Sequence, residues 1–244
     1  MPAPTSDPWD AHAAWWQEQF TQGVDPEYVE QILPLIAEHL PRTGRVVDVG
    51  CGEGQVARLA ADAGLEAVGV DAAGAQLAEA RRRAGGPTYV QGSATDLPLA
   101  ERSAQAAVAC LVFEHFADLD RALAEVARVL RPGGRFLFLM NHPLLQTPGS
   151  GWIDDQMLDP PEQYWRVGPY LPEAEVVEEF EHDVHIRFFH RPLSRYVNGA
   201  IDAGMDLEVM VEPTPPPGFL ALAEEYADIA TIPRLLFLRF RRRG

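Results

Sequence analysis

Lysine is missing from this chain of 244 residues, so all 20 basic side chains are arginines. The absence excludes a Schiff-base lysine, a phosphate-loop lysine and the Tyr-x-x-x-Lys acid–base pair of the short-chain dehydrogenases. The two cysteines, Cys51 and Cys110, match no disulfide framework and no C-x-x-C metal pattern. Two isolated thiols are typical of a protein in a reducing compartment.

Long apolar runs are missing as well. No stretch approaches the roughly 18 apolar residues of a membrane span, and residues 1–10 have neither the basic nor the apolar part of a secretory signal. Acidic side chains outnumber basic ones by 36 to 20, which gives a formal charge of −16 and disfavours binding to nucleic acids and anionic membranes. We therefore expect a cytoplasmic monomer or homodimer that acts on a small molecule.

The first 43 residues are expected to form a helical cap. Four large aromatic residues recur at helical spacing before a break at residues 23–26, namely Trp9, Trp15, Trp16 and Phe20. Asp25 as an N-cap and Pro26 at the first helical position predict a second helix that ends near residues 41–44.

From residue 44 onward, short apolar runs alternate with amphipathic segments. Strands are predicted at residues 45–49, 66–70, 88–91, 106–111, 135–140, 207–211 and 235–240, and helices at 55–63, 74–84, 119–130, 193–203 and 220–227. This order indicates an α/β domain (44–244) with a mostly parallel, seven-stranded sheet covered on both faces. Residues 142–190, rich in proline, glycine and aromatic residues, interrupt the order after the fifth strand and are expected to form a lid that binds substrate.

The most specific motif is a glycine loop that directly follows the first strand of this domain. Gly50, Gly52 and Gly54 permit positive φ and let a ligand approach backbone amides at a helix N-terminus. Their G-x-G-x-G spacing differs from the G-x-G-x-x-G of dinucleotide-binding proteins. Asp71 follows the second strand, where a carboxylate can accept hydrogen bonds from both hydroxyls of a ribose, cap the next helix, or do both.

Four motifs in this order resemble a class I S-adenosylmethionine (SAM)-dependent methyltransferase of the branch that includes quinone-biosynthesis and bacterial small-molecule enzymes. They are Asp-Val-Gly-Cys-Gly-Glu-Gly at 48–54, Asp71, Gly-Ser-Ala-Thr-Asp-Leu-Pro at 92–98, and Leu-Arg-Pro-Gly-Gly at 130–134. The resemblance covers about residues 44–141. It implies a Rossmann-like sheet whose last strand is antiparallel, SAM as cofactor and S-adenosylhomocysteine (SAH) as product.

Carried over residue by residue, the resemblance implies a cofactor site. The methionine moiety would lie on Asp48 and on the loop formed by Gly50, Cys51, Gly52 and Gly54, the ribose on Asp71, and the adenine beside Ala72, Ser93 and Ala94, with Leu111 facing the amino-acid end. Many relatives have Asp where this chain has Ser93. The contact to the adenine amino group is therefore weaker here or supplied by Asp96, which is equally well explained as a turn residue.

Transfer to a hydroxyl acceptor requires a base, and histidine is suited to that role near neutral pH. His142, after the fifth strand, is the first candidate, followed by His115 after the fourth strand and by His190 at the end of the insertion. Each is also explained as a loop residue or a helix cap. A metal-assisted reaction would need oxygen ligands at both strand ends, where only Asn141 is suitable, so no metal is expected.

Aromatic residues are candidates for the wall of an acceptor pocket, although each is also explained as a packing residue: Trp16, Phe20, Trp152, Tyr164, Trp165 and Tyr170. Arg191 could bind an acceptor carboxylate or form a surface ion pair. The sequence therefore predicts methyl transfer to a small organic acceptor, with oxygen as the favoured atom. The alternatives are N- or C-methylation, a non-catalytic protein that binds SAM or SAH, and an NAD(P)-dependent oxidoreductase.

Overall fold

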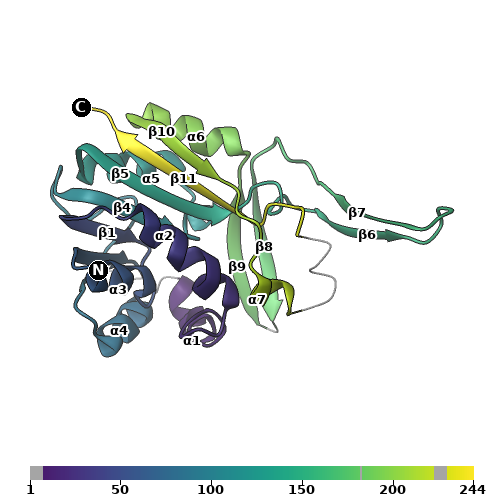
Figure 1. Ribbon diagram of the computed structural model, residues 1–244, viewed down its shortest axis with the longest axis horizontal. Coiled ribbons are helices and arrows are strands. Elements are labelled where there is room, and N and C mark those ends of the chain that lie inside the picture. The colour runs from purple at the N-terminus through teal and green to yellow at the C-terminus, as the bar shows by residue number, and fades with distance from the viewer. Residues whose placement is uncertain (1–7, 182, 223–229) are drawn as a thin grey trace, which may run out of the picture.

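The computed structural model describes residues 8–181, 183–222 and 230–244, and seven of its strands form one sheet (Figure 1). The strand order is β10-β11-β5-β4-β1-β2-β3. The bounds are β1 (Arg45–Val49), β2 (Glu66–Asp71), β3 (Thr88–Gln91), β4 (Ala104–Cys110), β5 (Leu130–Asn141), β10 (Met205–Val211) and β11 (Leu235–Arg242). The seven predicted strands are confirmed, although β5 begins at Leu130, five residues before its predicted start.

The direction of the strands also agrees with the prediction. β1 pairs in parallel with β2 and β4, β2 with β3, and β4 with β5, whereas β11 is antiparallel to both β5 and β10. The Rossmann-like sheet with an antiparallel last strand is therefore confirmed. The parallel strands place their carboxyl ends at one edge, where ligands bind in open α/β sheets.

Helices bury both faces of the sheet, because successive strand residues point to opposite sides. Leu236 and Leu238 of β11 belong to the core under α5 (Leu119–Val129) and α6 (Leu193–Asp202). Leu235 and Phe237 belong to the core under η1 (Tyr28–Ile32), α2 (Leu33–His39) and α3 (Gln55–Asp62). A further helix, α4 (Gly74–Arg83), packs against β2 and β3.

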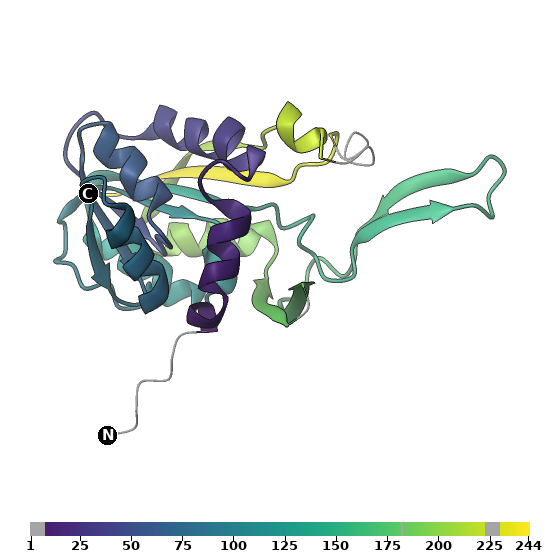
Figure 2. The ribbon, with the colours of Figure 1, turned by 90° about the horizontal axis from the view of Figure 1, so that it is seen from below.

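The N-terminal helix α1 (Pro8–Phe20) packs against α4 and lies across the body (Figure 2). Asp10 Oδ1 accepts a 2.8 Å hydrogen bond from the Ala75 amide at the start of α4. In the next helical segment, Asp25 Oδ1 accepts from the Glu27 amide at 2.8 Å, as expected of an N-cap, but η1 is a π-helical turn that the sequence did not predict. The division into a cap (1–43) and a domain (44–244) stays a prediction.

The insertion at 142–190 consists of two β-hairpins. The first, β6 (Gly151–Asp155) and β7 (Glu162–Arg166), projects away from the body (Figures 1 and 2). The second, β8 (Ala174–Glu181) and β9 (Val184–His190), packs Val184, Ile186 and Phe188 against Trp9 and Trp15 of α1. The first hairpin therefore extends away from the body, whereas the second packs on α1.

Two features of the remaining chain qualify the sequence-based predictions. The helix predicted at 220–227 begins earlier, as α7 (Pro217–Leu220), and residues 223–229 lie outside the described part of the chain. Over the residues that are described, no helix has the length and apolar character needed to cross a membrane.

We expect Leu123→Ala to lower the free energy of unfolding by about 2–5 kcal/mol, because it would leave a cavity in the core beneath α5. Leu123 is completely buried in that core. Urea unfolding measures the change. The matched control is Leu207→Ala on β10, where the side chain is 38% exposed and a change within about 0.5 kcal/mol is expected. Equal losses in the two variants would contradict the assignment of the core.

Candidate active site

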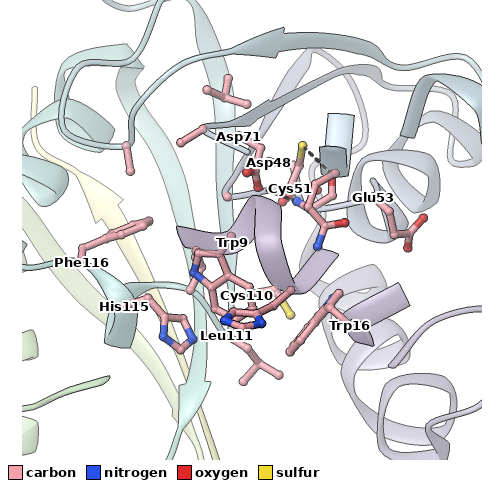
Figure 3. Close-up of a pocket in the computed structure, with 18 of the residues that line it drawn as sticks. Trp9, Trp16, Asp48, Cys51, Glu53, Asp71, Cys110, Leu111, His115 and Phe116 are labelled. Carbon is pink, nitrogen blue, oxygen red and sulfur yellow. Dashed lines mark hydrogen bonds between the residues drawn. The ribbon is translucent and has the colours of Figure 1, made fainter. Parts of the chain in front are cut away.

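A cavity of about 310 Å³ opens at the carboxyl ends of β1, β2 and β4 (Figure 3). It lies where the chain, after building β2 and β3 on one side of β1, continues with β4 on the other side. Such a reversal of strand order leaves a crevice between neighbouring loops. α1 and β9 complete the wall opposite the sheet, through Trp9 and Trp16 and through residues 185–187 and 189.

The glycine loop forms part of the cavity wall with its backbone. Gly50 has φ of +71° and Gly54 has φ of +89°, and a Cβ atom would collide with Val112 at the first position and with the Tyr89 hydroxyl at the second. A Cβ on Gly52, which lines the cavity, would meet nothing within 4 Å. The absent side chain at Gly52 therefore leaves room for a ligand against the main chain.

Asp71 ties this loop to the end of β2. Its Oδ2 accepts from the Gly52 amide and its Oδ1 from the Ala73 amide, both at 2.8 Å. Each carboxylate oxygen has a second acceptor site, and Asp71 lines the cavity. The side chain can thus support the loops and still accept hydrogen bonds from a ligand.

Two further carboxyl groups make this end of the cavity acidic. Asp48 is 2% exposed and accepts from the Ala57 amide at 2.9 Å; burial, reinforced by the charges of Asp71 and Glu53, raises the pKa of its carboxyl to about 7. Glu53 Oε2 pairs with Arg58 at 2.6 Å and Arg83 at 2.7 Å, while its buried Oε1 has no hydrogen-bond partner. A cationic ligand group would favour the charged form of Asp48, whereas the charge of Glu53 is already paired with Arg58 and Arg83.

Most of the predicted cofactor residues surround the same space. The residues that line the cavity are Asp48, Gly50, Cys51, Gly52, Asp71, Ala72, Ser93, Ala94 and Leu111. Gly54 is not among them and acts through the loop conformation. Asp96 is also outside: it is exposed, and its amide donates to the Ser93 carbonyl at 3.1 Å, which places it in the turn after β3.

Of the three candidate histidines, only His115 lines the cavity. It lies in η2 (Phe113–His115), directly after β4, and Figure 3 shows it near Trp9. Its Nδ1 lies 2.8 Å from the Arg187 carbonyl, which can only accept, so Nδ1 carries the proton and the Nε2 lone pair is available. Burial lowers the pKa of the imidazole, so the ring is neutral at pH 7.

His142, the first candidate for the base, lies outside the cavity, and both of its ring nitrogens have partners elsewhere. Its Nδ1 accepts from the Leu144 amide at 3.1 Å, so its Nε2 carries the proton and lies 2.9 Å from Glu212 Oε1. His190 also lies outside the cavity, with Nε2 2.8 Å from the Tyr170 carbonyl. Neither ring is placed to accept a proton from a ligand in this cavity.

The predicted acceptor residues are divided between the cavity and other places. Trp16 lines the cavity, and Phe20 stacks on it with ring centroids 4.4 Å apart. Trp152 pairs with Trp165 across the projecting hairpin, and Tyr164 lies on the same hairpin. These three aromatic side chains do not line the cavity, because β6 and β7 carry them away from the body (Figure 2).

Tyr170 and Arg191 have structural contacts instead of cavity positions. The Tyr170 hydroxyl accepts from the Leu193 amide at 2.8 Å. Arg191 donates to the carbonyls of Phe116 and Ala117, at 2.7 and 2.9 Å. The expected carboxylate-binding role of Arg191 is therefore replaced by contacts within the chain.

The sequence analysis missed several residues that line the cavity, among them Trp9, His12, Tyr28 and His185. A signal for two of them was present. Trp9, His12 and Trp16 are spaced i, i+3 and i+7 and share one face of α1. Nothing in the spacing of Tyr28 or His185 points to the cavity, because each is brought there by packing between distant segments.

Comparison with known proteins shows which family the chain is similar to. Residues 47–138 match the family model of a methyltransferase domain. The chain is 34% identical over 119 residues to a demethylmenaquinone methyltransferase of Thermotoga maritima, covering 48% of this chain and 51% of that protein. It is 37% identical over 97 residues to a malonyl-(acyl-carrier protein) O-methyltransferase of Enterobacter lignolyticus, covering 40% and 39%.

A solved S-adenosylmethionine-dependent methyltransferase from Mesorhizobium loti superimposes with a TM-score of 0.75 at 28% identity, covering 86% of this chain and 96% of that one. The chain therefore contains a class I SAM-dependent methyltransferase domain, and the resemblance drawn from the motifs is confirmed. It spans only about two fifths to one half of the length of the two curated relatives.

We expect the stability of the protein to depend on pH through Asp48. Its folded-state pKa is raised to about 7, so the folded chain binds more protons than the unfolded chain between about pH 4 and pH 7. This carboxyl contributes stability at low pH, and the contribution is lost as the pH rises through 7. Asp48→Asn should therefore gain stability relative to the wild type between pH 5 and pH 8, measured by urea unfolding.

The reference for this comparison is Asp62→Asn, at an exposed position on α3. A difference between Asp48→Asn and wild type that does not change with pH, as in the reference pair, would contradict the raised pKa.

Proposed function

We propose that this protein binds SAM in the cavity and transfers its methyl group to the hydroxyl of a small organic acceptor. The observation that carries the proposal is the combination, in one cavity, of an acidic glycine-loop end and a neutral histidine with a free acceptor nitrogen. The family relationship supports the cofactor.

The hydrogen-bonding groups at the glycine-loop end of the cavity fit SAM. Gly52 presents bare backbone, the Asp71 carboxylate lines the cavity as a hydrogen-bond acceptor suited to ribose hydroxyls, and Asp48 supplies a carboxyl group for a cationic amino-acid end. Ala72, Ser93 and Ala94 would bound the adenine. When bound, SAM supplies an electrophilic methyl group to a nucleophile aligned with the carbon–sulfur bond.

His115 would accept the proton of the acceptor hydroxyl. The Arg187 carbonyl holds the Nδ1–H tautomer, in which Nε2 carries the lone pair that would accept this proton. The lowered pKa keeps that lone pair free at neutral pH. Oxygen is the favoured acceptor atom because a hydroxyl needs such a base, and because the relative from Enterobacter lignolyticus is an O-methyltransferase.

We assign acceptor selection to α1 and β9, and not to the whole insertion. Trp9, His12 and Trp16 reach the cavity from α1, and His185 and Phe189 do so from β9. The β6–β7 hairpin contributes no lining residue. Of the segment 142–190 that was predicted to bind substrate, we therefore assign this role to the second hairpin alone.

Asp71→Ala should weaken SAH binding at least about tenfold, because the variant loses charge-assisted hydrogen bonds to the ribose. Calorimetric titration with SAH measures the affinity, with NAD and NADP as parallel ligands. The exposed Asp62→Ala serves as the control. Unchanged affinity in Asp71→Ala would remove the ribose assignment, and binding of NAD or NADP in place of SAH would favour the oxidoreductase alternative.

His115→Ala should lower turnover by about 10²–10⁴-fold while SAH affinity stays within about twofold. The assay measures SAH release by mass spectrometry over a panel of small phenols, hydroxy acids, amines and carbon nucleophiles. His39→Gln is the control, since His39 packs on Phe237 outside the cavity. Full turnover of His115→Ala would remove His115 as the base, and no turnover by the wild type with tight SAH binding would favour a binding protein.

A further inference from the structure

The turn that carries His115 is held from both sides by buried polar side chains that do not line the cavity. Residues 113–117 follow β4 and contain only short-range backbone hydrogen bonds, from His115 to Val112 and from Phe116 to Phe113. A turn of this length does not fix a side chain by itself. Its position must come from neighbouring elements.

Glu114 fixes the turn from the sheet side. Its Oε1 accepts a 2.9 Å hydrogen bond from Asn141 Nδ2 at the end of β5. The residue is 4% exposed, and its second carboxylate oxygen is buried without a hydrogen-bond partner. A buried carboxylate retained in this way is costly, which points to a role beyond packing.

Arg191 fixes the turn from the side of the second hairpin. One terminal nitrogen donates to the carbonyls of Phe116 and Ala117, the two residues after His115. The guanidinium also lies over the Phe189 ring at 5.3 Å and 3.4 Å from Glu173. Arg191 is 4% exposed, so these bonds are shielded from water.

We propose that Glu114 and Arg191 are positioning residues that hold the His115 ring, in its Nδ1–H tautomer, against the carbonyl of Arg187. The inference rests on the proposed role of His115 as the base. The side chain of Glu114 anchors the position directly before His115, and Arg191 anchors the two positions after it. Arg191 also directly follows β9, the strand that supplies the Arg187 carbonyl. Glu114 and Arg191 therefore set the distance between the Nδ1–H donor of His115 and the carbonyl of Arg187 from both sides of the turn.

The pairing also couples the hairpin to the histidine. Any movement of β8 and β9 away from the turn would break the Arg191 bonds and the His115 bond together, because both connect β9 and its following residue to 115–117. Other charged or titratable groups around this space are His12 on α1, His185 and Arg187 on β9, and Tyr28, Asp48, Cys51, Glu53, Asp71 and Cys110 elsewhere in the lining. Burial lowers the pKa of His115, and the charge of Glu114 partly offsets that effect.

The test follows the ring of His115 by nitrogen NMR in the SAH-bound full chain, with the signal assigned by its loss in His115→Gln. In the wild type we expect the Nδ1–H tautomer. Arg191→Gln should give a mixture of tautomers and about tenfold faster amide hydrogen exchange in 113–117. Glu114→Leu, which cannot accept from Asn141, should likewise give a mixture of tautomers and faster exchange, whereas Glu114→Gln should retain the Asn141 contact and the wild-type tautomer.

Arg195→Gln is the matched control, because Arg195 also pairs with Glu173 but makes no bond to 113–117. Arg191→Lys should restore most of the tautomer and the protection, since an ammonium can still donate to both carbonyls. Arg191→Met, which loses both donors, replaces Arg191→Gln if that variant does not fold. SAH affinity should stay within about twofold throughout.

A wild-type tautomer that is unchanged in Arg191→Gln, with exchange equal to that of Arg195→Gln, would overturn the positioning role of Arg191. A tautomer and an exchange rate that stay at the wild-type values in Glu114→Leu would overturn that of Glu114. Failure of the wild type to bind SAH would instead overturn the proposed function. Full turnover of His115→Ala would overturn the role of His115 as the base.

Discussion

The carboxylate of Asp71 holds the candidate site together, because it joins two loops that leave different strands. One oxygen accepts from the Gly52 amide after β1 and the other from the Ala73 amide after β2. Without this bridge, a loop with three positive-φ glycines would have many conformations of similar energy. Because Asp71 accepts from both amides and also lines the cavity, one side chain can serve both the protein and a ligand.

The cavity has two chemically different ends. Asp48, Glu53 and Asp71 gather at the end formed by β1 and β2, where burial and mutual repulsion favour a cationic partner. Trp9, Trp16 and His115 gather at the other end, where the imidazole is neutral. The proposed methyl transfer to a hydroxyl would use both ends, because SAM is a cation and the hydroxyl would have to lose a proton beside it.

The sheet and the glycine-loop end were predictable because they depend on local patterns. Alternating apolar runs predicted the seven strands, and the motif from Asp48 to Gly54 with Asp71 predicted which strand ends form the site. The base was not predictable in the same way. His115 and His142 both follow neighbouring strands, and the difference arises from Glu212 and Leu144, which engage His142, and from Arg187, which orients His115.

The sequence by itself therefore determined the fold class, the family and the glycine-loop end of the cavity, since strand periodicity and loop glycines act over a few residues. Only the tertiary structure decided which residues form the opposite end. The aromatic residues of 142–170 satisfy any sequence pattern for a lid, yet β6 and β7 carry them away from the body, while α1 and β9 bring Trp9, His12 and His185 to the cavity. Contacts between segments more than 100 residues apart leave no periodic signal in either segment, so packing alone selects among them.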